Sequence, residues 1–207
     1  RIAFNTLKFF PATYTGMVVA IMATSTILSP IVPNSYSKCA VLGPFAASVA
    51  KANNIEKGSK AAAGLFCAFF VPAAIHTMAF LTGSAMTFVL IGMMGEGYSF
   101  SWFGWFMCCS VWFAVNLVLT FLFILVYYRP KEKLNISKDL INRKIAELKP
   151  MNSDEKAASV ILILSILLWI TGSYTGLKPY TVAALAFCAM FLKGIFTMKD
   201  FQDMVPW

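Results

Sequence analysis

The chain has 207 residues, of which 59% are hydrophobic and 13% are charged. Soluble domains are nearer half apolar and a quarter charged, so this composition excludes an ordinary soluble protein. The net charge of +8 does not indicate nucleic-acid binding, because lysines and arginines beside long apolar runs usually record orientation in a bilayer. We therefore expect an all-α integral membrane protein that contacts the lipid bilayer and binds no nucleic acid.

A polar break interrupts the first apolar part of the chain. Residues 9–32 and 39–50 are apolar and flank the sequence Ser-Pro-Ile-Val-Pro-Asn-Ser-Tyr-Ser-Lys at 29–38. Pro30 and Pro33 prevent one continuous helix, because proline lacks a backbone donor and restricts the residue before it. The second run is shorter than the ~20 residues that span a bilayer, which favours a re-entrant hairpin. The alternatives are an ordinary kinked helix or a loop between two spans.

The charge pattern indicates that this first break is buried. Lys38 is the only charged residue between Lys8 and Lys51. Unpaired peptide groups cost several kcal/mol each in lipid, so a buried break must lie within protein or against a wet cavity. Transporters bind solutes at such positions.

A second break is predicted in the next apolar run. Residues 61–95 carry no charged side chain, and about 35 residues are too many for one straight helix across a ~30 Å hydrocarbon core. Glycine and hydroxyl residues at 82–87 (Thr-Gly-Ser-Ala-Met-Thr) favour unwinding near the middle of the run. The length of the run predicts a discontinuous helix whose break lies at about the same depth as the first.

The remaining segments complete the predicted topology. Lysine and arginine are frequent in 51–60 and 129–156, which places both segments on the cytoplasmic side. Apolar residues at helical spacing within 129–156 predict an amphipathic helix on the membrane surface. The predicted divisions are a re-entrant hairpin region at 1–60, a discontinuous transmembrane helix at 61–101, a transmembrane helix at 102–128, a cytoplasmic amphipathic linker helix at 129–156, and two transmembrane helices with an interfacial end at 157–207.

Two helix breaks at one depth are how secondary transporters assemble sites for an anion and a cation. A helix N-terminus offers free N–H groups and about half a positive charge to a carboxylate, and the carbonyls before it suit sodium. A buried Lys38 is a candidate for attracting the anion and replacing a sodium ion, which favours exchange over symport. The alternative is a lysine that snorkels or pairs structurally.

Other chemistry is weakly supported. His76 lies in an uncharged span and is a candidate for proton coupling, although a hydrogen-bonded packing role is more usual for a lone histidine. The five cysteines show no CxxC spacing and are predicted to be small buried apolar residues. We find no paired acids, Ser-His-Asp set or metal-ligand cluster, so no enzyme activity is expected. The rivals are a non-transporting membrane subunit or receptor, and a lipid-active enzyme with His76 as base.

Several motifs resemble those of one transporter family. Arg1-Ile2-Ala3, Leu28-Ser29-Pro30 and the stretch from Val32 to Lys38 are similar to RIA, LAP and PSNTAR of the divalent anion:sodium symporter family, in its citrate, dicarboxylate and 2-oxoglutarate/malate translocator branch. Residues 80–87 resemble its FLTGxAxN. Further matches to its LGPM, DEK, LW and W pattern are Leu148 to Met151, Asp154 to Lys156, Leu168-Trp169 and Trp207. The resemblance runs nearly end to end.

The resemblance implies a member of the ion transporter superfamily with two inverted repeats, each with a re-entrant hairpin and a broken helix. Such carriers move a di- or tricarboxylate, such as succinate, malate or citrate, by an elevator motion against a homodimeric scaffold. They are sodium-coupled symporters or anion exchangers. By this resemblance the chain covers part of one repeat and the start of the second, within a multi-pass protein of a bacterial inner membrane.

The resemblance also assigns site residues by position. Asn34, Ser35 and Tyr36 occupy the family's Ser-Asn-Thr slots, and Gly83, Ser84 and Thr87 occupy the broken-helix slots. The candidate substrate residues are Asn34, Ser35, Tyr36, Lys38 and Ser84; the candidate sodium residues are Asn34, Ser35, Gly83 and Thr87. No cofactor is expected besides a coupling sodium ion. Two departures stand out: Tyr36 is far bulkier than threonine, and Thr87 replaces an asparagine.

Overall fold

The computed structural model describes residues 10–11, 13–32, 34–95, 98, 100–130 and 150–199, and these residues form helices, turns and loops with no β-strand. The chain divides into two compact units. Unit 1 comprises Arg1–Tyr98 and Trp105–Leu148, and unit 2 comprises Ser99–Gly104 and Lys149–Trp207. The all-α prediction is confirmed for the described residues.

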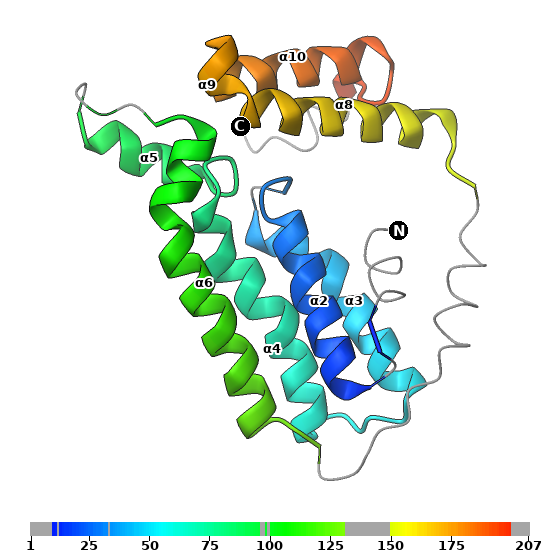
Figure 1. The fold of residues 1–207 in the computed structure, drawn as a ribbon. Coiled ribbons are helices and arrows are strands. Elements are labelled where there is room, and N and C mark those ends of the chain that lie inside the picture. Colours follow the sequence, from blue (N-terminus) through cyan, green and yellow to red (C-terminus); the bar gives the residue numbers. More distant parts are fainter. Residues whose placement is uncertain are drawn as a thin grey trace. The chain divides into compact units, whose positions relative to one another are not determined.

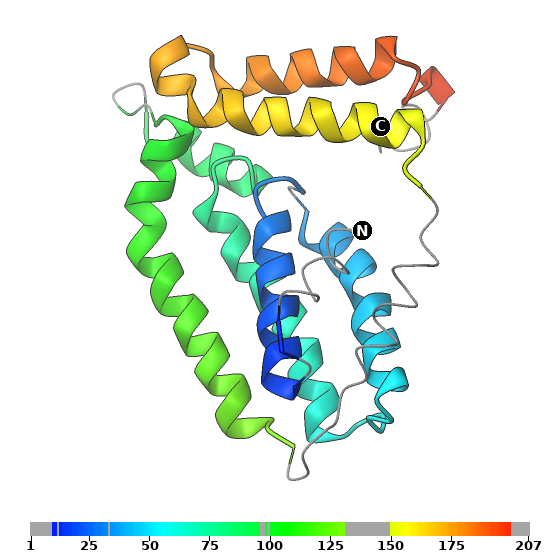
Figure 2. The ribbon, with the colours of Figure 1, turned by 45° about the vertical axis from the view of Figure 1, so that its right-hand side comes forward.

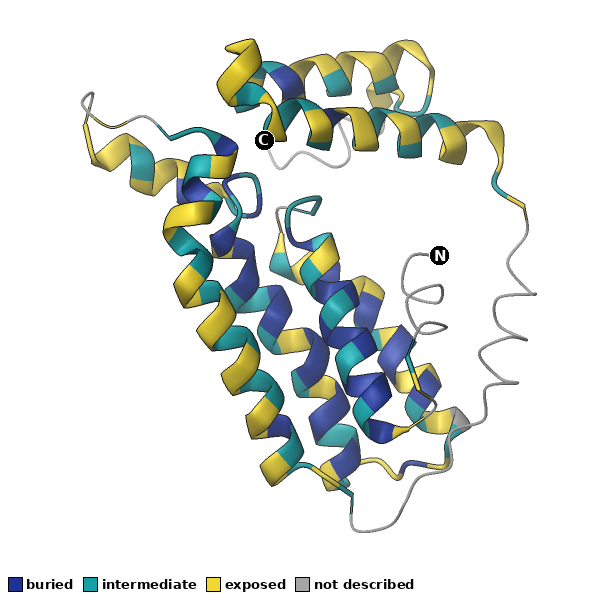
Figure 3. Ribbon diagram, viewed as in Figure 1, coloured by how far each residue is buried: buried dark blue, intermediate teal, exposed yellow. Residues whose placement is uncertain are grey.

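Three helices form the centre of unit 1. They are α2 (Tyr14–Leu28), α3 (Ser35–Ala52) and α4 (Lys60–Ile75), which lie side by side in Figures 1 and 2. Their facing sides bury an apolar core that includes Met17, Val18, Ile21, Leu42 and Leu65, and Figure 3 shows the buried residues concentrated where these helices meet. Burial of these side chains is the main contribution that holds the helices together within the unit.

The long helix α6 (Trp102–Tyr127) runs beside α4 in both ribbon views. At one end of unit 1, the Tyr14 hydroxyl donates to the Ala61 carbonyl at 3.2 Å. A Cβ built on Gly64 would lie 2.8 Å from Cβ of Tyr128, just beyond α6. The starts of α2 and α4 and the end of α6 therefore lie together. This agrees with the predicted topology, in which 51–60 and the residues from Arg129 onward share one side.

The first break is shorter than the sequence predicts. Helix α3 begins at Ser35, so residues 35–38 are helical, and α3 has 18 residues instead of about a dozen. The reason is a side-chain cap: Asn34 Oδ1 accepts a hydrogen bond from the Tyr36 backbone N–H at 2.8 Å. Such a cap satisfies a donor that the first helical turn leaves free, so the helix starts at once. The first break is defined hereafter as residues 29–34.

The second break begins earlier than predicted. After α4 the chain forms a 3-10 helix, η1 (His76–Ala79), and a turn, and α5 (Ala85–Met93) follows. The Thr77 hydroxyl donates to the Ala74 carbonyl at 2.9 Å, a local bond that competes with the helical pattern. Ser84 caps α5 by accepting from the Met86 N–H. The second break is therefore residues 76–84, and residues 85–87 are already helical.

Unit 2 is a helical pair. Helices α8 (Ser153–Ile170) and α10 (Pro179–Leu192) lie side by side, joined through the single turn α9 (Gly172–Thr175) (Figures 1 and 2). Asn152 and Glu155 form a capping box at the start of α8. Residues 153–156 thus belong to this helix, not to the predicted linker. The linker prediction at 131–149, the RIA motif and the end at 201–207 lie outside the described residues.

Two helical stretches of the described chain have the length and composition to cross a membrane, Lys60–Ala79 and Trp102–Tyr127. The other apolar helices of 10–17 residues, Tyr14–Leu28 and Pro179–Leu192, are shorter. At 1.5 Å per residue α2 is about 22 Å long, which is less than the ~30 Å of a hydrocarbon core.

Candidate functional site

The first break is anchored by Ser29, which is completely buried. Its hydroxyl donates to the Ser25 carbonyl at 3.0 Å and accepts from Lys38 Nζ at 3.3 Å. One serine thus connects the end of α2 to the first turns of α3. The elbow is held in a defined conformation although proline interrupts its helix.

The second break contains a close backbone approach at Gly83. A Cβ built there would collide with the Thr77 carbonyl oxygen and lie 3.0 Å from the Ser29 carbonyl oxygen. Only glycine fits this position without a shift of backbone. Four residues on, Thr87 is 4% exposed, and it follows the cap of α5 within the first helical turn.

The two breaks are in direct contact. Thr82 Oγ1 donates to the Pro30 carbonyl at 3.0 Å, across 52 positions of sequence. The approach of Gly83 to Ser29 provides a second contact between them. The two breaks therefore lie at the same level of unit 1, as a common depth in the membrane requires. Two helix N-termini, those of α3 and α5, follow these touching turns.

Lys38 brings a positive charge to this region. Its side chain is 1% exposed, and Ser29 Oγ is its hydrogen-bond partner. Within the described residues of unit 1 the only acid is Glu56, which is exposed in a loop. A buried ammonium group without a carboxylate partner is costly, so its presence is a reason to look for an anion nearby.

His76 lies on η1 beside the first break. It is fully buried, its Nδ1 is 3.0 Å from Thr26 Oγ1, and its ring packs edge-on against Phe113 at 5.0 Å. Its Nε2 has no hydrogen-bond partner among the described residues. The ring therefore connects α2, η1 and α6, which fits the predicted packing role.

The predicted site residues differ in their placement. Gly83 and Thr87 are buried, Ser35 and Ser84 are half-buried, Asn34 is exposed, and Tyr36 is 86% exposed. Gly83 and Lys38 are brought to Ser29. Among the described residues, no hydrogen bond joins Asn34 or Ser35 to Gly83, Ser84 or Thr87. Asn34 and Ser84 instead play the same local role, each capping the helix that follows its break.

The contacts that hold the site together are not among the sequence predictions. Ser29 and Thr82 belong to the predicted breaks but have no predicted role, and Thr26 is not among the predicted site residues. The paired occurrence of hydroxyl residues on both sides of each break was the available signal. Which hydroxyl meets which carbonyl depends on how the two breaks pack, and one sequence does not contain that information.

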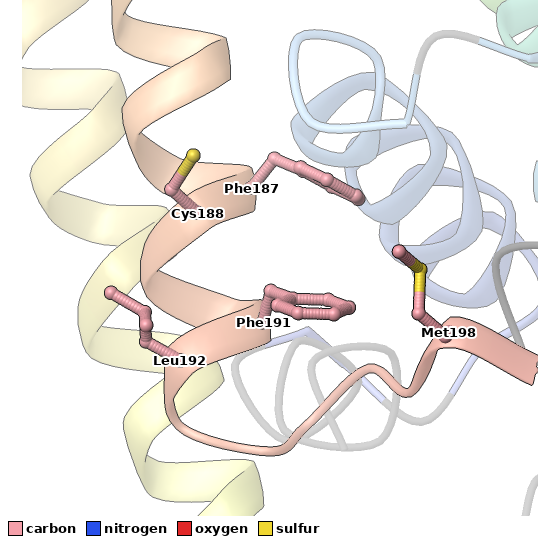
Figure 4. Close-up of a pocket in the computed structure, with 5 residues that line it drawn as sticks. All are labelled: Phe187, Cys188, Phe191, Leu192 and Met198. Atoms are coloured by element: carbon pink, nitrogen blue, oxygen red, sulfur yellow. The ribbon is translucent and has the colours of Figure 1, made fainter.

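The pocket of unit 2 and the described His, Cys, Asp and Glu residues offer no anion or metal site. Phe187, Cys188, Phe191, Leu192 and Met198 of unit 2 line a pocket of about 330 Å³, and Figure 4 shows that their side chains present only carbon and sulfur. No group of three His, Cys, Asp or Glu residues is close enough to bind a metal in the described residues. The prediction of buried cysteines is wrong: Cys108 and Cys188 are exposed and the other three are half-buried, although Cys39 and Cys67 pack against the apolar core of unit 1.

Comparison with known proteins gives a consistent result. The chain matches the family model described as "Sodium:sulfate symporter transmembrane region" over residues 1–207. It is 26% identical to dicarboxylate transporter 1, chloroplastic, of Spinacia oleracea over 221 residues, which cover 100% of the chain and 38% of the relative. It is 24% identical to a membrane protein of Cupriavidus necator (100% and 42%) and 27% identical to an uncharacterized transporter of Haemophilus influenzae (97% and 43%).

The chain thus spans about two fifths of the length of these curated relatives. The match over its whole length covers both breaks and both units. It also agrees with the motif resemblance, which was based on residues spread over the entire chain. The chain is an integral membrane protein that belongs to the sodium:sulfate symporter family of transporters, the divalent anion:sodium symporter family.

Proposed function

We propose that this chain is part of a secondary active transporter for an organic anion, a di- or tricarboxylate such as succinate, malate or citrate. The observation that carries the proposal is the contact between the two breaks through Thr82 and the Pro30 carbonyl. It brings the N-termini of α3 and α5 to one region, and each N-terminus carries free N–H groups and a partial positive charge. The dicarboxylate transporter among its relatives supports the substrate class.

In this proposal α2 and α3 form a re-entrant hairpin whose tip is the first break. The short length of α2 supports it, as does the position of the hairpin's open end beside Ala61. The chain would supply part of one of two inverted repeats, in a homodimer that works by elevator-type alternating access. We place the protein in a bacterial inner membrane, as two of the relatives reported above are bacterial. Recovery from another membrane fraction of the source cells would contradict that placement.

The anion would contact Asn34, Ser35, Tyr36, Lys38 and Ser84, and a sodium ion would be held by Asn34, Ser35, Gly83 and Thr87. The residues proposed to hold sodium offer backbone carbonyl, side-chain amide and hydroxyl oxygens, and oxygen ligands suit a hard cation. The buried ammonium of Lys38 next to the first break carries a charge like that of sodium. Its position favours anion exchange, because a fixed positive charge reduces the need for a bound cation.

The test is uptake by the whole protein in liposomes. Radiolabelled succinate, malate or citrate is added outside, with either an inward sodium gradient or unlabelled anion inside. We expect uptake above protein-free liposomes; dependence on internal anion without sodium identifies exchange, and dependence on the sodium gradient identifies symport. Absence of uptake of all three anions under both conditions would favour the non-transporting subunit or receptor.

Lys38→Ala tests the role of the charge. We expect the KM for the anion to rise about tenfold, because a charge-assisted hydrogen bond is worth roughly 1.5–3 kcal/mol. Lys38→Arg should retain most of the affinity. Lys156→Ala, which removes an exposed lysine of α8, is the matched control and should leave KM unchanged. An unchanged KM in Lys38→Ala would assign the residue a purely structural role.

A further inference from the structure

A concave surface of unit 1 lies toward the C-terminal end of α3, away from the capped N-terminus at Asn34. It is a groove of about 680 Å³ between α3, the loop after it and the start of α4. Gly43, Ala46, Ala47 and Ala50 form the α3 wall, and Leu65, Phe66 and Phe69 belong to the α4 wall. Because the α3 residues are small, the groove runs about 10 Å along the helix with an apolar lining.

Two lysines close one end of this groove. Lys51 belongs to the last turn of α3 and Lys57 to the loop that follows, and both are exposed. No acid is among the residues that line the groove. The lining therefore has an apolar part and a cationic end, which is the complement of an amphipathic anion.

The location fits the boundary between membrane and water. This end of unit 1 also holds the start of α4 and the end of α6, as the contacts of Tyr14 with Ala61 and of Tyr128 with Gly64 show. The charged residues Lys60 and Arg129 lie next to those helix ends in sequence. A lysine that lies beside a bound anionic headgroup contributes about 1 kcal/mol to binding.

We propose that this groove binds an anionic phospholipid. The headgroup phosphate lies between Lys51 and Lys57, and part of an acyl chain occupies the groove between Ala47 and Phe66. Charge complementarity selects this occupant: a neutral apolar segment would bury the lysine end without a partner, whereas a lipid phosphate pairs with it. The site is separate from the two breaks, and the proposal does not depend on which solute the protein carries.

The first test compares two lipids on the whole detergent-solubilised protein. Native mass spectrometry is used to titrate dioleoyl-phosphatidylglycerol and dioleoyl-phosphatidylcholine. We expect phosphatidylglycerol to bind at least fivefold more tightly than phosphatidylcholine. K51Q and K57Q should each weaken phosphatidylglycerol binding about fivefold. K60Q removes an exposed lysine that does not line the groove, and it should weaken phosphatidylglycerol binding less than twofold.

Equal affinity for the two lipids would overturn the proposal, and it is the result expected if another segment of the protein fills the groove. If K60Q lost as much phosphatidylglycerol affinity as K51Q, the proposal would also be overturned, because anionic lipid would then be attracted to the basic surface in general. Neither result bears on transport, so failure here is distinguishable from failure of the proposed function.

The second test addresses the apolar part of the site. A47F places a large ring in the groove from an exposed position of α3, and S48F places the same ring one residue on, at an exposed position outside the lining. We expect A47F to lower phosphatidylglycerol affinity at least threefold more than S48F does. If both variants bind like the unmodified protein, the acyl chain does not use this groove and the proposal fails.

Discussion

Unit 1 and unit 2 contain apolar helices of similar composition, yet they differ in what they bury. The helices of unit 1 bury Thr24, Ser25, Ser29, Lys38, His76, Thr77 and Thr87. In the described helices of unit 2 the buried polar residue is Ser165, whose hydroxyl donates to the Ile161 carbonyl of its own helix. Figure 3 shows the corresponding contrast, with exposed residues along most of α8 and α10.

Polar burial accompanies broken helices in this chain. In α8 and α10 the backbone groups pair within each helix, so apolar side chains can face outward over the whole length. In unit 1 the two breaks leave peptide groups that require partners, and hydroxyls and a lysine are buried beside them. We therefore expect changes at the breaks to affect transport and changes in unit 2 to affect stability.

Gly83→Ala should have the largest effect. The added Cβ would collide with the Thr77 carbonyl oxygen and approach that of Ser29, so one of the two breaks must move. We expect anion uptake to fall about 100-fold or more, since a 1 Å displacement of binding groups can cost that much. Gly92→Ala is the matched control, because a Cβ on Gly92 of α5 meets nothing within 4 Å. Equal uptake by the two variants would contradict the role of the contact.

Thr82→Val removes the hydroxyl that joins the two breaks and leaves the Pro30 carbonyl without that donor. This hydrogen bond is half-buried, and the loss of a partner costs roughly 1–3 kcal/mol for a group withdrawn from water, so we expect uptake to fall by up to about tenfold. Thr82→Ser keeps the hydroxyl and should retain near-normal uptake. If serine and valine were equivalent, the hydrogen bond to Pro30 would not be what holds the breaks together.

The approximate positions of the two breaks can be predicted from the sequence alone. Pro30 and the Thr-Gly-Ser run predict where helices break, because proline lacks a donor and glycine lowers the cost of unwinding. Each break ends earlier in the structure than in the prediction, because Asn34 and Ser84 cap the helices that begin at the next residue. A cap depends on one side-chain rotamer, which pattern and propensity do not determine.

The candidate site is predicted less completely. The burial of Lys38 follows from the lack of other charges around it, but its partner Ser29 lies nine residues back across the elbow. Likewise, Thr82 meets Pro30 because α2 and α4 pack along their length, through small and branched side chains such as Ala20, Ile21 and Ala68. Such pairings depend on tertiary packing, so residue types alone indicate a site without giving its contacts.

His76→Gln should have a smaller effect on transport than either change at the breaks. Glutamine can still hydrogen-bond Thr26, while the edge-on contact with Phe113 is lost. We expect uptake within about threefold of normal and a loss of roughly 1 kcal/mol of stability, typical of a weakened aromatic contact. The measurement is uptake with and without an imposed pH gradient. If a pH gradient drives uptake in the unmodified protein and not in His76→Gln, the packing role is wrong and His76 couples proton movement.

Asn152→Ala, at the start of α8 in unit 2, should have the smallest effect on transport. Asn152 Oδ1 accepts from the Glu155 N–H at 2.7 Å, and the Glu155 carboxylate accepts from the Asn152 N–H at 3.3 Å. Loss of such a cap costs about 1 kcal/mol of helix stability, so the unfolding temperature should fall by a few degrees while uptake stays unchanged. Asn152→Asp keeps the capping oxygen and should preserve both. A fall in uptake with Asn152→Ala comparable to that with Thr82→Val would contradict the division of roles between the two units, because a continuous helix of unit 2 would then contribute to transport as much as the broken helices do.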